Sequence, residues 1–360
     1  MLFDRYGRPL DNLRITVTTA CNYNCVFCHR EGEETNNTQL TPDQITDVAT
    51  AAYSLDIRKF KITGGEPLLR EDLPEIIHSL KSIGKGIEVS LTTNGYLLED
   101  KLNRLVDKGL DRVNVSLHAV SPQTYVAVTQ VKGQDKVLRG LSLAKDYSLP
   151  VKLNYVLTKA NVGELEKVLD YASKMGFNVN LIELIPQGKG KEIFDKLYVP
   201  AEEVLPLLES KSSRVEVRPL HSRPIFKLET GIQVEVIANY CNPFFCAGCT
   251  RIRLTHDGKL KTCLNRDDNL VDIRNTLMDR SHEKLYKLRE SIIKANFLRE
   301  PFFKMNGYGA TTYDGKITCP LRKIAQLSLS HEEKKKNNFG TYSRFSATTS
   351  ARVFNVTLTP

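Results

Sequence analysis

The sequence predicts an α/β protein: a partial (β/α)6 barrel of the TIM type with a C-terminal extension. Six runs rich in Val, Ile, Leu and Thr recur between residues 13 and 185, a composition typical of covered strands. Amphipathic helical stretches separate the runs, and such alternation favours a parallel sheet wound in one hand. Polar and cysteine-containing motifs follow the strand ends, where parallel barrels carry their chemistry.

The predicted strands are 13–18, 58–63, 86–93, 112–117, 151–158 and 178–185. No G-x-G-x-x-G follows the first run, which argues against a dinucleotide-binding sheet. In the helix after the first run, Thr41 is the expected N-cap, Pro42 the first helical residue and Gln44 the partner in a capping box. A later helix is expected to end at Gly176 and to carry an apolar stripe of Leu165, Val168, Leu169 and Ala172.

We predict three regions: the barrel over residues 1–190, the extension over 191–304 and a divergent tail over 305–360. Residues 191–240 are expected to hold one helix, "PAEEVLPLLESKS", and two extended runs. A hairpin turning at Asp257-Gly258 and a helix near 281–298 should follow. In the tail, "SLSHEEKKKNNFG" is expected to be solvated or flexible.

The composition is that of an ordinary globular protein, with 360 residues, 41% hydrophobic and 26% charged. The chain lacks an apolar run of eighteen residues, and its first residues are too charged for a signal peptide, so we expect cytoplasmic residence. The net charge of +9 fits a lysine-rich surface, a nucleic-acid binder or a site for a polyanionic ligand.

Seven of the eight cysteines fall into two clusters, 21–28 and 241–263, while Cys319 stands apart. In a reducing compartment such clusters indicate metal sites rather than disulfides. The first cluster, C-x3-C-x2-C, consists of Cys21, Cys25 and Cys28 directly after the first strand. Structural zinc and ordinary iron–sulfur clusters take four ligands, so three thiolates would leave one iron open to a small molecule. The alternative is a zinc site completed by His29 or another residue.

With Phe27 before its last cysteine and "TGGEP" after the second strand, this region resembles the radical S-adenosyl-L-methionine enzymes. The resemblance implies that Cys21, Cys25 and Cys28 hold a [4Fe–4S] cluster whose open iron is chelated by the methionine amino and carboxylate groups. One electron then yields a 5′-deoxyadenosyl radical. Gly64 and Gly65 would permit close approach of the backbone to the ligand, and the charge of Glu66 suits an ammonium group. The implied adenosylmethionine contacts are Phe27, Gly64, Gly65, Glu66, Ser116 and Ile185.

The second cluster supplies Cys246, Cys249 and Cys263, spaced C-x2-C-x13-C. Zinc with Cys241 as a fourth thiolate is the alternative to an open iron–sulfur cluster. Arg251 and Arg253 follow the cysteine pair, and alternate residues of a strand face the same side. Two guanidinium groups beside an open cluster would suit a polyphosphate or another anion.

Two three-cysteine clusters with C-T-R-I-R after the second pair resemble the GTP 3′,8-cyclase family over about Leu13 to Leu264. The resemblance implies conversion of GTP to (8S)-3′,8-cyclo-7,8-dihydroguanosine 5′-triphosphate, the first step of molybdenum cofactor biosynthesis. The first cluster would generate the radical, which abstracts the ribose 3′ hydrogen before C3′ attacks guanine C8. A second [4Fe–4S] cluster on Cys246, Cys249 and Cys263 would hold the guanine. The implied GTP contacts are Arg14, Lys61, Thr92, Lys152, Arg251, Ile252 and Arg253, with Lys59 as a weaker candidate.

The resemblance further implies an electron donor, a homodimer and transfer of the product to the next enzyme, cyclic pyranopterin monophosphate synthase. Two positions depart from the family. Lys61 stands where many relatives carry Arg, which keeps the charge but loses the bidentate fork. The family usually ends in Gly-Gly, whereas this chain ends "FNVTLTP", and "NGYG" at 306–309 is no adequate substitute. Either this branch manages without the tail, or the last residues are an extension of different origin.

Two other functions fit the cysteine runs less well. A peptide-modifying radical enzyme with an auxiliary cluster generally needs more cysteines than the chain has. A basic zinc protein that binds nucleic acid would interleave aromatic and basic residues, but neither cysteine run does so and Trp is absent.

Overall fold

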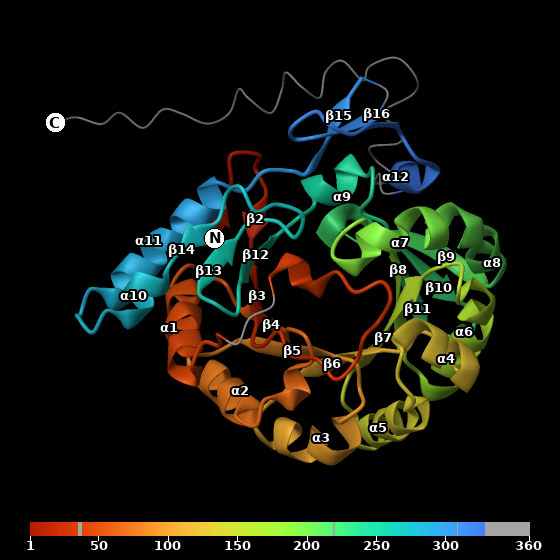
Figure 1. The fold of residues 1–360 in the computed structure, drawn as a ribbon, viewed down its shortest axis with the longest axis horizontal. Coiled ribbons are helices and arrows are strands. Elements are labelled where there is room, and N and C mark those ends of the chain that lie inside the picture. The colour runs from red at the N-terminus through yellow and green to blue at the C-terminus, as the bar shows by residue number, and fades with distance from the viewer. Residues whose placement is uncertain (35–37, 219, 308, 328–360) are drawn as a thin grey trace.

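The structure is a computed structural model that describes residues 1–34, 38–218, 220–307 and 309–327 (Figure 1). Its main sheet has twelve strands in the order β14-β13-β12-β3-β4-β5-β6-β7-β8-β11-β10-β9. Strands β3 to β8 are parallel and adjacent in chain order, which confirms the predicted partial barrel. Their bounds are β3 (Asn12–Thr16), β4 (Lys59–Thr63), β5 (Glu88–Thr93), β6 (Arg112–Ser116), β7 (Val151–Leu157) and β8 (Asn178–Glu183).

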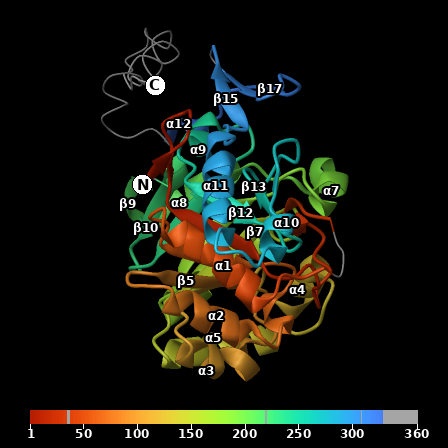
Figure 2. The ribbon, with the colours of Figure 1, turned by 90° about the vertical axis from the view of Figure 1, so that its left-hand side faces the viewer.

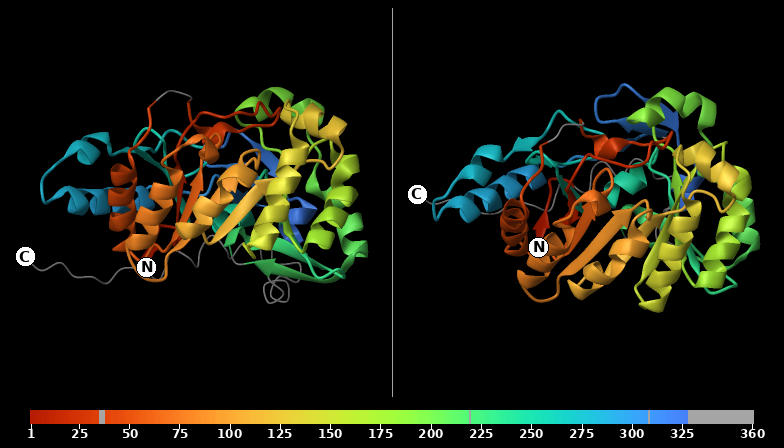
Figure 3. Two further views of the ribbon diagram at one scale, coloured as in Figure 1. Left: turned by 90° about the horizontal axis from the view of Figure 1, so that it is seen from below. Right: turned by 60° about the horizontal axis from the view of Figure 1, so that its bottom comes forward.

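Helices cover the outer face of this curved sheet (Figures 1 and 3). They are α1 (Pro42–Tyr53), α2 (Leu73–Ser82), α3 (Leu98–Asp107), α4 (Pro122–Thr129), α5 (Gln134–Asp146) and α6 (Leu165–Met175). Thr41 caps α1 through the predicted capping box with Gln44. Gly176 ends α6 in the left-handed conformation, with φ 76°. Both helix boundaries are therefore confirmed, because each depends only on local residues.

The two faces of the parallel strands differ in polarity. Leu13, Ile15 and Phe60 belong to the hydrophobic core under the helices. The alternate residues face the barrel interior, and the register places Arg253, Arg14 and Lys61 side by side there. Strand alternation thus assembles a row of cations inside the barrel.

The extension adds strands to both edges of the barrel sheet. At one edge β11 (Gln233–Ile237) runs parallel to β8 and is followed by β10 (Arg223–Leu228) and β9 (Ser212–Arg218). At the other edge β12 (Arg251–Leu254) runs parallel to β3 and pairs with β13 (Lys259–Lys261), which pairs with β14 (Val271–Asp272). The predicted hairpin with Asp257-Gly258 in its turn is confirmed.

The prediction of one helix and two extended runs over 191–240 is wrong in part. Helix α7 (Lys189–Leu197) precedes the predicted helical segment, which forms η4 (Ala201–Val204) and α8 (Leu205–Ser210). Three strands follow rather than two runs. In α7 only Gly190 is fully buried, while Ile193, Phe194 and Leu197 are partly buried, so the sequence prediction missed a short amphipathic helix.

The remaining elements lie outside the six parallel strands, and α11 packs against α1. They are β1 (Leu2–Phe3), β2 (Pro9–Leu10), α9 (Pro243–Ala247), α10 (Arg274–Met278), α11 (Lys284–Phe297), β15 (Phe303–Asn306), β16 (Gly309–Thr312), β17 (Thr318–Pro320) and α12 (Lys323–Leu327). Short 3-10 turns are η1 (Arg30–Gly32), η2 (Pro67–Leu69), η3 (Val162–Glu164) and η5 (Leu220–Ser222). Strands β15 to β17 form a small antiparallel sheet that projects beyond α9 (Figure 2).

The described part of the predicted tail, up to residue 327, thus forms strands and a helix, whereas "SLSHEEKKKNNFG" lies outside the described residues. Within the part of the chain that the structure describes, no helix has both the length and the hydropathy that crossing a membrane requires.

Candidate active site

A cavity of about 490 Å³ brings the two cysteine triplets together. Cys21, Cys25 and Cys28 line it from the loop after β3. Cys246 and Cys249 line it from α9 and the turn that follows, and Cys263 lines it from just beyond β13. Because β12 pairs directly with β3, the second motif is placed next to the first despite their distance in sequence.

The thiols of the first triplet are close enough to influence one another. Burial raises the pKa of Cys21 to about 11. Burial, with added repulsion from Cys28 and Cys21, raises the pKa of Cys25. A metal would have to displace these protons, as iron does when it binds thiolates. Three clustered thiols that line a cavity fit a cluster with one iron free of protein ligands. Among the described residues, no group of three or more Cys, His, Asp or Glu side chains has the geometry to hold a single metal ion.

The glycines of "TGGEP" are required by close packing of backbone on backbone. A Cβ on Gly65 would lie 2.1 Å from the carbonyl oxygen of Ala20, and one on Gly64 would lie 2.4 Å from that of Thr18. The N–H of Gly65 donates to the Thr18 carbonyl at 2.7 Å. Both glycines line the cavity and support the loop that leads into Cys21.

Glu66 lies differently from the prediction that its charge faces an ammonium group. Its carboxylate is fully buried and accepts hydrogen bonds from Thr93 Oγ1 at 2.6 Å and from the N–H groups of Asn94 and Leu68. Burial raises the pKa of Glu66 to about 7. The donors Thr93 and Asn94 reach Glu66 because β5 pairs with β4. The Glu66 side chain is not among the residues that line the cavity.

Ser116, Ile185 and Phe27, the other residues predicted to contact adenosylmethionine, line the cavity. Phe27 packs edge-on against His118, with ring centroids 4.6 Å apart. The backbone N–H of Val156 donates to Nδ1 of His118, and burial lowers the pKa of this histidine to about 3. The imidazole is therefore neutral and protonated on Nε2.

Only some of the residues predicted to contact GTP line the cavity. Arg14, Thr92, Arg251 and Arg253 line the cavity. Lys61 is buried nearby, where burial together with Arg14 and Arg251 lowers its pKa well below the usual range. Lys152 donates to Glu235 at 2.7 Å.

Two further predicted GTP contacts do not line the cavity. The Ile252 side chain is fully buried in the hydrophobic core, because it alternates with the inward-facing Arg251 and Arg253. Lys59 is half exposed and pairs with Asp11 at 2.7 Å. Neither the Ile252 side chain nor Lys59 thus lines the cavity, and both stay predictions as GTP contacts.

Sequence reasoning missed the carboxylates that hold the cations. Glu31 accepts from Arg14 Nη1 at 3.1 Å, from Thr63 Oγ1 at 2.9 Å and from Arg253. Its place three residues after Cys28 was a usable signal. Glu235 pairs with Lys152 and with Arg223, the latter at 2.8 Å. No motif marks Glu235 or Arg223, and only the order β8-β11-β10 brings them to the site.

Carboxylates pair with Arg14, Arg223 and Arg253, but not with every cation of the cavity. Burial, followed by repulsion from Arg223 and Arg14, lowers the pKa of Arg251 well below the usual range. No described residue forms an ion pair with Arg251. Buried polar atoms without a hydrogen-bond partner among the described residues include Nε of Arg14, Arg223 and Arg251 and Oγ1 of Thr92. Such a lining fits an anionic ligand.

The second triplet has its own supporting contacts. The N–H of Phe303 donates to Sγ of Cys246 at 3.4 Å. Arg8 donates to the carbonyl oxygen of Cys246 at 2.9 Å, and Arg299 donates to that of Cys249. Burial raises the pKa of Cys246 to about 12. For Cys249, burial acts in the same direction, but the arginines outweigh it and the pKa is lowered.

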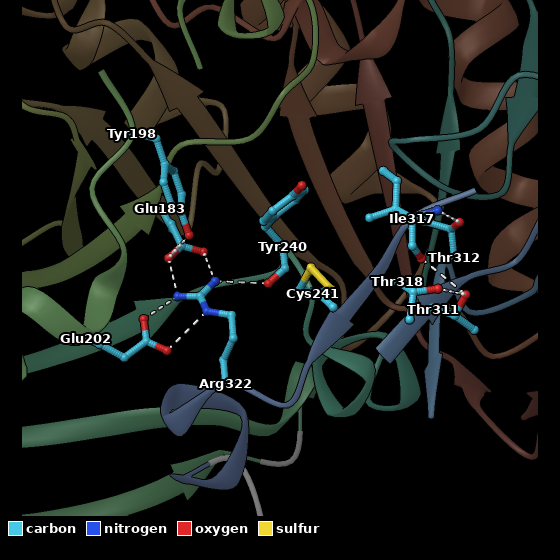
Figure 4. Close-up of a disulfide and its surroundings, with 11 residues drawn as sticks. Glu183, Tyr198, Glu202, Tyr240, Cys241, Thr311, Thr312, Ile317, Thr318 and Arg322 are labelled. Atoms are coloured by element: carbon cyan, nitrogen blue, oxygen red, sulfur yellow. Dashed lines mark hydrogen bonds and ion pairs between the residues drawn. A yellow bond between two sulfur atoms is a disulfide. The ribbon is translucent and has the colours of Figure 1, made fainter. Parts of the chain in front are cut away.

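Cys241 forms a disulfide with Cys319 (Figure 4). Its sulfur is thus not available as a fourth zinc ligand beside Cys246, Cys249 and Cys263, and the expectation that the cysteine clusters form no disulfide is wrong for Cys241. Sequence spacing could not show this pairing, because the two cysteines are 78 residues apart.

Comparisons with known proteins show which protein families the chain resembles. Residues 15–172 match the Radical SAM superfamily, and residues 177–305 match Molybdenum Cofactor Synthesis C. "Probable GTP 3′,8-cyclase" of Metallosphaera sedula is 44% identical over 309 residues, covering 84% of this chain and 97% of the relative. The protein of the same name from Sulfolobus acidocaldarius is 47% identical, and the match covers 84% of this chain and 96% of that relative.

Solved structures share the fold. Streptococcus suis SuiB bound to its precursor peptide SuiA superimposes with a TM-score of 0.58 at 14% identity, covering 78% of this chain and 66% of SuiB. Native anSMEcpe, solved with bound AdoMet and a peptide, superimposes with a TM-score of 0.53 at 17% identity. The match covers 89% of this chain and 94% of anSMEcpe. Adenosylmethionine and an iron–sulfur cluster are the cofactors of the superfamily. With this level of identity over nearly the full length of its relatives, the chain belongs to the GTP 3′,8-cyclase family of radical S-adenosylmethionine enzymes.

Proposed function

We propose that this chain converts GTP to (8S)-3′,8-cyclo-7,8-dihydroguanosine 5′-triphosphate, the first step of molybdenum cofactor biosynthesis. One observation carries the proposal: both cysteine triplets line the same cavity as the guanidinium group of Arg251, which has no ion pair among the described residues. The proposed radical source and the proposed anion site would therefore share a space of about 490 Å³, a typical size for a ligand pocket.

At the first triplet, Cys21, Cys25 and Cys28 would hold a [4Fe–4S] cluster. When bound and reduced, this cluster supplies the electron that cleaves adenosylmethionine. Gly64, Gly65, Ser116 and Ile185 form the wall against which adenosylmethionine would lie. Phe27 and the neutral His118 exclude water beside it.

At the second triplet, Cys246, Cys249 and Cys263 would hold a second [4Fe–4S] cluster next to the guanine. Arg14, Arg251 and Arg253 would bind the triphosphate, and Thr92 would donate its unpartnered hydroxyl. Lys61 and Lys152 would add charge from just beyond the cavity wall. Arg14 and Arg253 already share Glu31, so the triphosphate competes with that carboxylate, whereas it meets no such competitor at Arg251.

The electron donor, a homodimer, transfer of the product to cyclic pyranopterin monophosphate synthase and cytoplasmic residence belong to the same proposal. So does the division into regions 1–190, 191–304 and 305–360. The peptides bound to the two structural neighbours favour no second function, because the likeness extends only to the fold.

The proposal is tested by anaerobic incubation with GTP, adenosylmethionine and a strong reductant. Mass analysis should show 5′-deoxyadenosine and the cyclised triphosphate, and an iron and sulfide assay should give about eight irons per chain, four for each cluster. Cleavage of adenosylmethionine with GTP left unchanged would reject the cyclase, and zinc without sulfide would reject the radical chemistry.

Single cysteine variants separate the two triplets. We expect Cys25→Ser to abolish adenosylmethionine cleavage, because it removes a ligand of the first cluster. Cys249→Ser should retain uncoupled cleavage but lose GTP turnover. Reductive cleavage that survives in Cys25→Ser would exclude the first triplet as the radical source.

A further inference from the structure

The C-terminal cap, residues 301–327, folds over the second cysteine triplet and continues past residue 305, where the match to the family ends. It comprises β15, β16, β17 and α12 and lies beside α9, the helix that carries Cys246 (Figures 1 and 2). Phe302 of the cap lines the cavity.

The cap has a small core of its own around Cys246. Cys241, Phe303 and Ala310 are buried together, with Cys246 packed against them. The hydrogen bond from Phe303 N–H to Cys246 Sγ ties β15 to the triplet. The Cys241–Cys319 disulfide then joins the end of the cap to the residue that precedes the N-cap of α9 (Figure 4).

Three residues beyond Cys319, Arg322 makes a second attachment. It donates to both carboxylate oxygens of Glu183, at 2.6 and 2.8 Å, to Glu202 and to the Tyr240 carbonyl at 3.0 Å (Figure 4). Glu183 is 2% exposed, ends β8 and lines the cavity, and it also accepts from Tyr198 at 3.0 Å. Leu184 and Ile185 continue the same wall.

Removal of Arg322 would leave the Glu183 carboxylate buried without its cation. Such a carboxylate becomes protonated or moves toward water, and either change removes the charge-assisted contact that ties the end of β8 to the cap. Loss of the disulfide would act at the other attachment, since β17 would be held beside the start of α9 by noncovalent contacts alone.

We propose that the C-terminal cap is a positioning element for both halves of the cavity, fastened by the Cys241–Cys319 disulfide at the second triplet and by Arg322 at the end of β8. Cys246 and Glu183 keep their positions only while the cap is docked. Occupancy of the second triplet by iron therefore depends on the oxidation state of a disulfide outside that triplet. This last consequence rests on the proposed second cluster, whereas the positioning of Cys246 does not.

The first test uses the full-length protein without iron. Cys319→Ser and Arg322→Met are compared with the wild type and with Lys323→Met, which removes a neighbouring exposed charge. Iodoacetamide is added and the alkylation rates of Cys246 and Cys21 are followed by peptide mass analysis. Cys21 is the internal reference, because it is the most exposed of the free cysteines although its thiol is partly shielded. We expect the Cys246 rate relative to Cys21 to rise about tenfold in Cys319→Ser, because local opening controls access to a buried thiol. Lys323→Met should behave as wild type.

Mild reduction of the wild type should reproduce the Cys319→Ser rate. This measurement keeps the proposal falsifiable if that variant folds poorly, which far-UV circular dichroism would reveal. An unchanged Cys246 rate in both the reduced wild type and Cys319→Ser would overturn the role of the disulfide.

The second test uses iron-loaded protein. Cys319→Ser should hold about four irons per chain instead of about eight and should still cleave adenosylmethionine. Arg322→Met should bind adenosylmethionine about tenfold more weakly by calorimetry, and Arg322→Lys should recover part of that loss because it keeps the charge but not the fork. Equal affinity in Arg322→Met and Lys323→Met would overturn the role of Arg322. If the wild type itself formed no cyclised product, the proposed function would fail while the alkylation result stood.

Discussion

Among individual residues, Glu31 shows how the cavity tolerates so many cations. Its side chain is 7% exposed and lies between Arg14 and Arg253, which are themselves almost buried. Burial alone would raise the pKa of Glu31, but the two arginines outweigh it and hold the pKa well below the usual range. Glu31 is therefore the counter-ion of both arginines, and a bound triphosphate would take its place there.

We expect Glu31→Gln to lower the free energy of unfolding at pH 7 by about 3 kcal/mol, because it leaves buried arginines without a partner. The native pKa of Glu31 is depressed, so its stabilisation is present above the ordinary pKa of about 4.3 and is lost as the pH falls below it. Urea unfolding of wild type and variant across this range should show the difference narrowing at acid pH. A difference independent of pH would mean that the carboxylate charge is not what stabilises the fold.

Arg251 is the cation of the cavity whose charge a bound anion would neutralise without displacing a carboxylate of the described residues. We expect Arg251→Ala to weaken GTP binding at least about tenfold, since a charge-assisted hydrogen bond contributes about 1.5–3 kcal/mol. Calorimetry on the loaded protein measures this, with Lys59→Ala as the matched control, because Lys59 also carries one charge but pairs with Asp11 outside the cavity. Equal affinities in the two variants would remove Arg251 from the GTP site.

Among the elements, the loops after β3 and β4 depend on each other. The N–H of Glu66 donates to the Ala20 carbonyl at 2.7 Å, next to the contact that leaves no room for a Cβ on Gly65. From sequence alone, the glycine pair indicates a place where backbone approaches a ligand. The structure shows that it first allows one loop to approach the other, which sets the position of Cys21.

We expect Gly65→Ala to displace the 18–20 segment and to lower the iron bound at the first triplet, because the new Cβ would lie 2.1 Å from the Ala20 carbonyl oxygen. The iron content should fall from about eight to about four per chain while the second cluster is retained. Gly163→Ala is the control, since no atom lies within 4 Å of its added Cβ. Full iron in Gly65→Ala would show that the loop can relax without losing the triplet.

In the whole molecule, a single sheet carries both halves of the site. The extension supplies β11 and β10 to one edge of the barrel and β12 to the other, so one continuous sheet brings Arg223 and Arg253 to the lining of the same cavity. The disulfide then closes a span of 78 residues between the extension and its C-terminal cap.

We expect Cys319→Ser to lower the free energy of unfolding by about 2–4 kcal/mol, because the disulfide restricts the unfolded chain over a long loop. Chemical denaturation with and without a reductant measures this, and the reduced wild type should match the variant. A variant as stable as the oxidised wild type would show that the disulfide does not form in solution.

Much of the barrel could be predicted because its signals are local. Strand composition, the capping box at Thr41 and Gly176 at the end of α6 concern residues within one element, and the cysteine spacing identified the superfamily. Even the outward direction of Ile252 followed from strand alternation with Arg251, although the prediction did not use it.

The sequence by itself determined the parallel (β/α) order, the two cysteine triplets and the family. Only the tertiary structure decided that the triplets share a cavity, that Glu31 and Glu235 neutralise its cations, and that Cys241 and Arg322 attach the C-terminal cap. Each of these contacts joins side chains from different elements. No local sequence pattern encodes these contacts. The order of the strands in the sheet sets which side chains meet, and a buried charge without a partner would be costly.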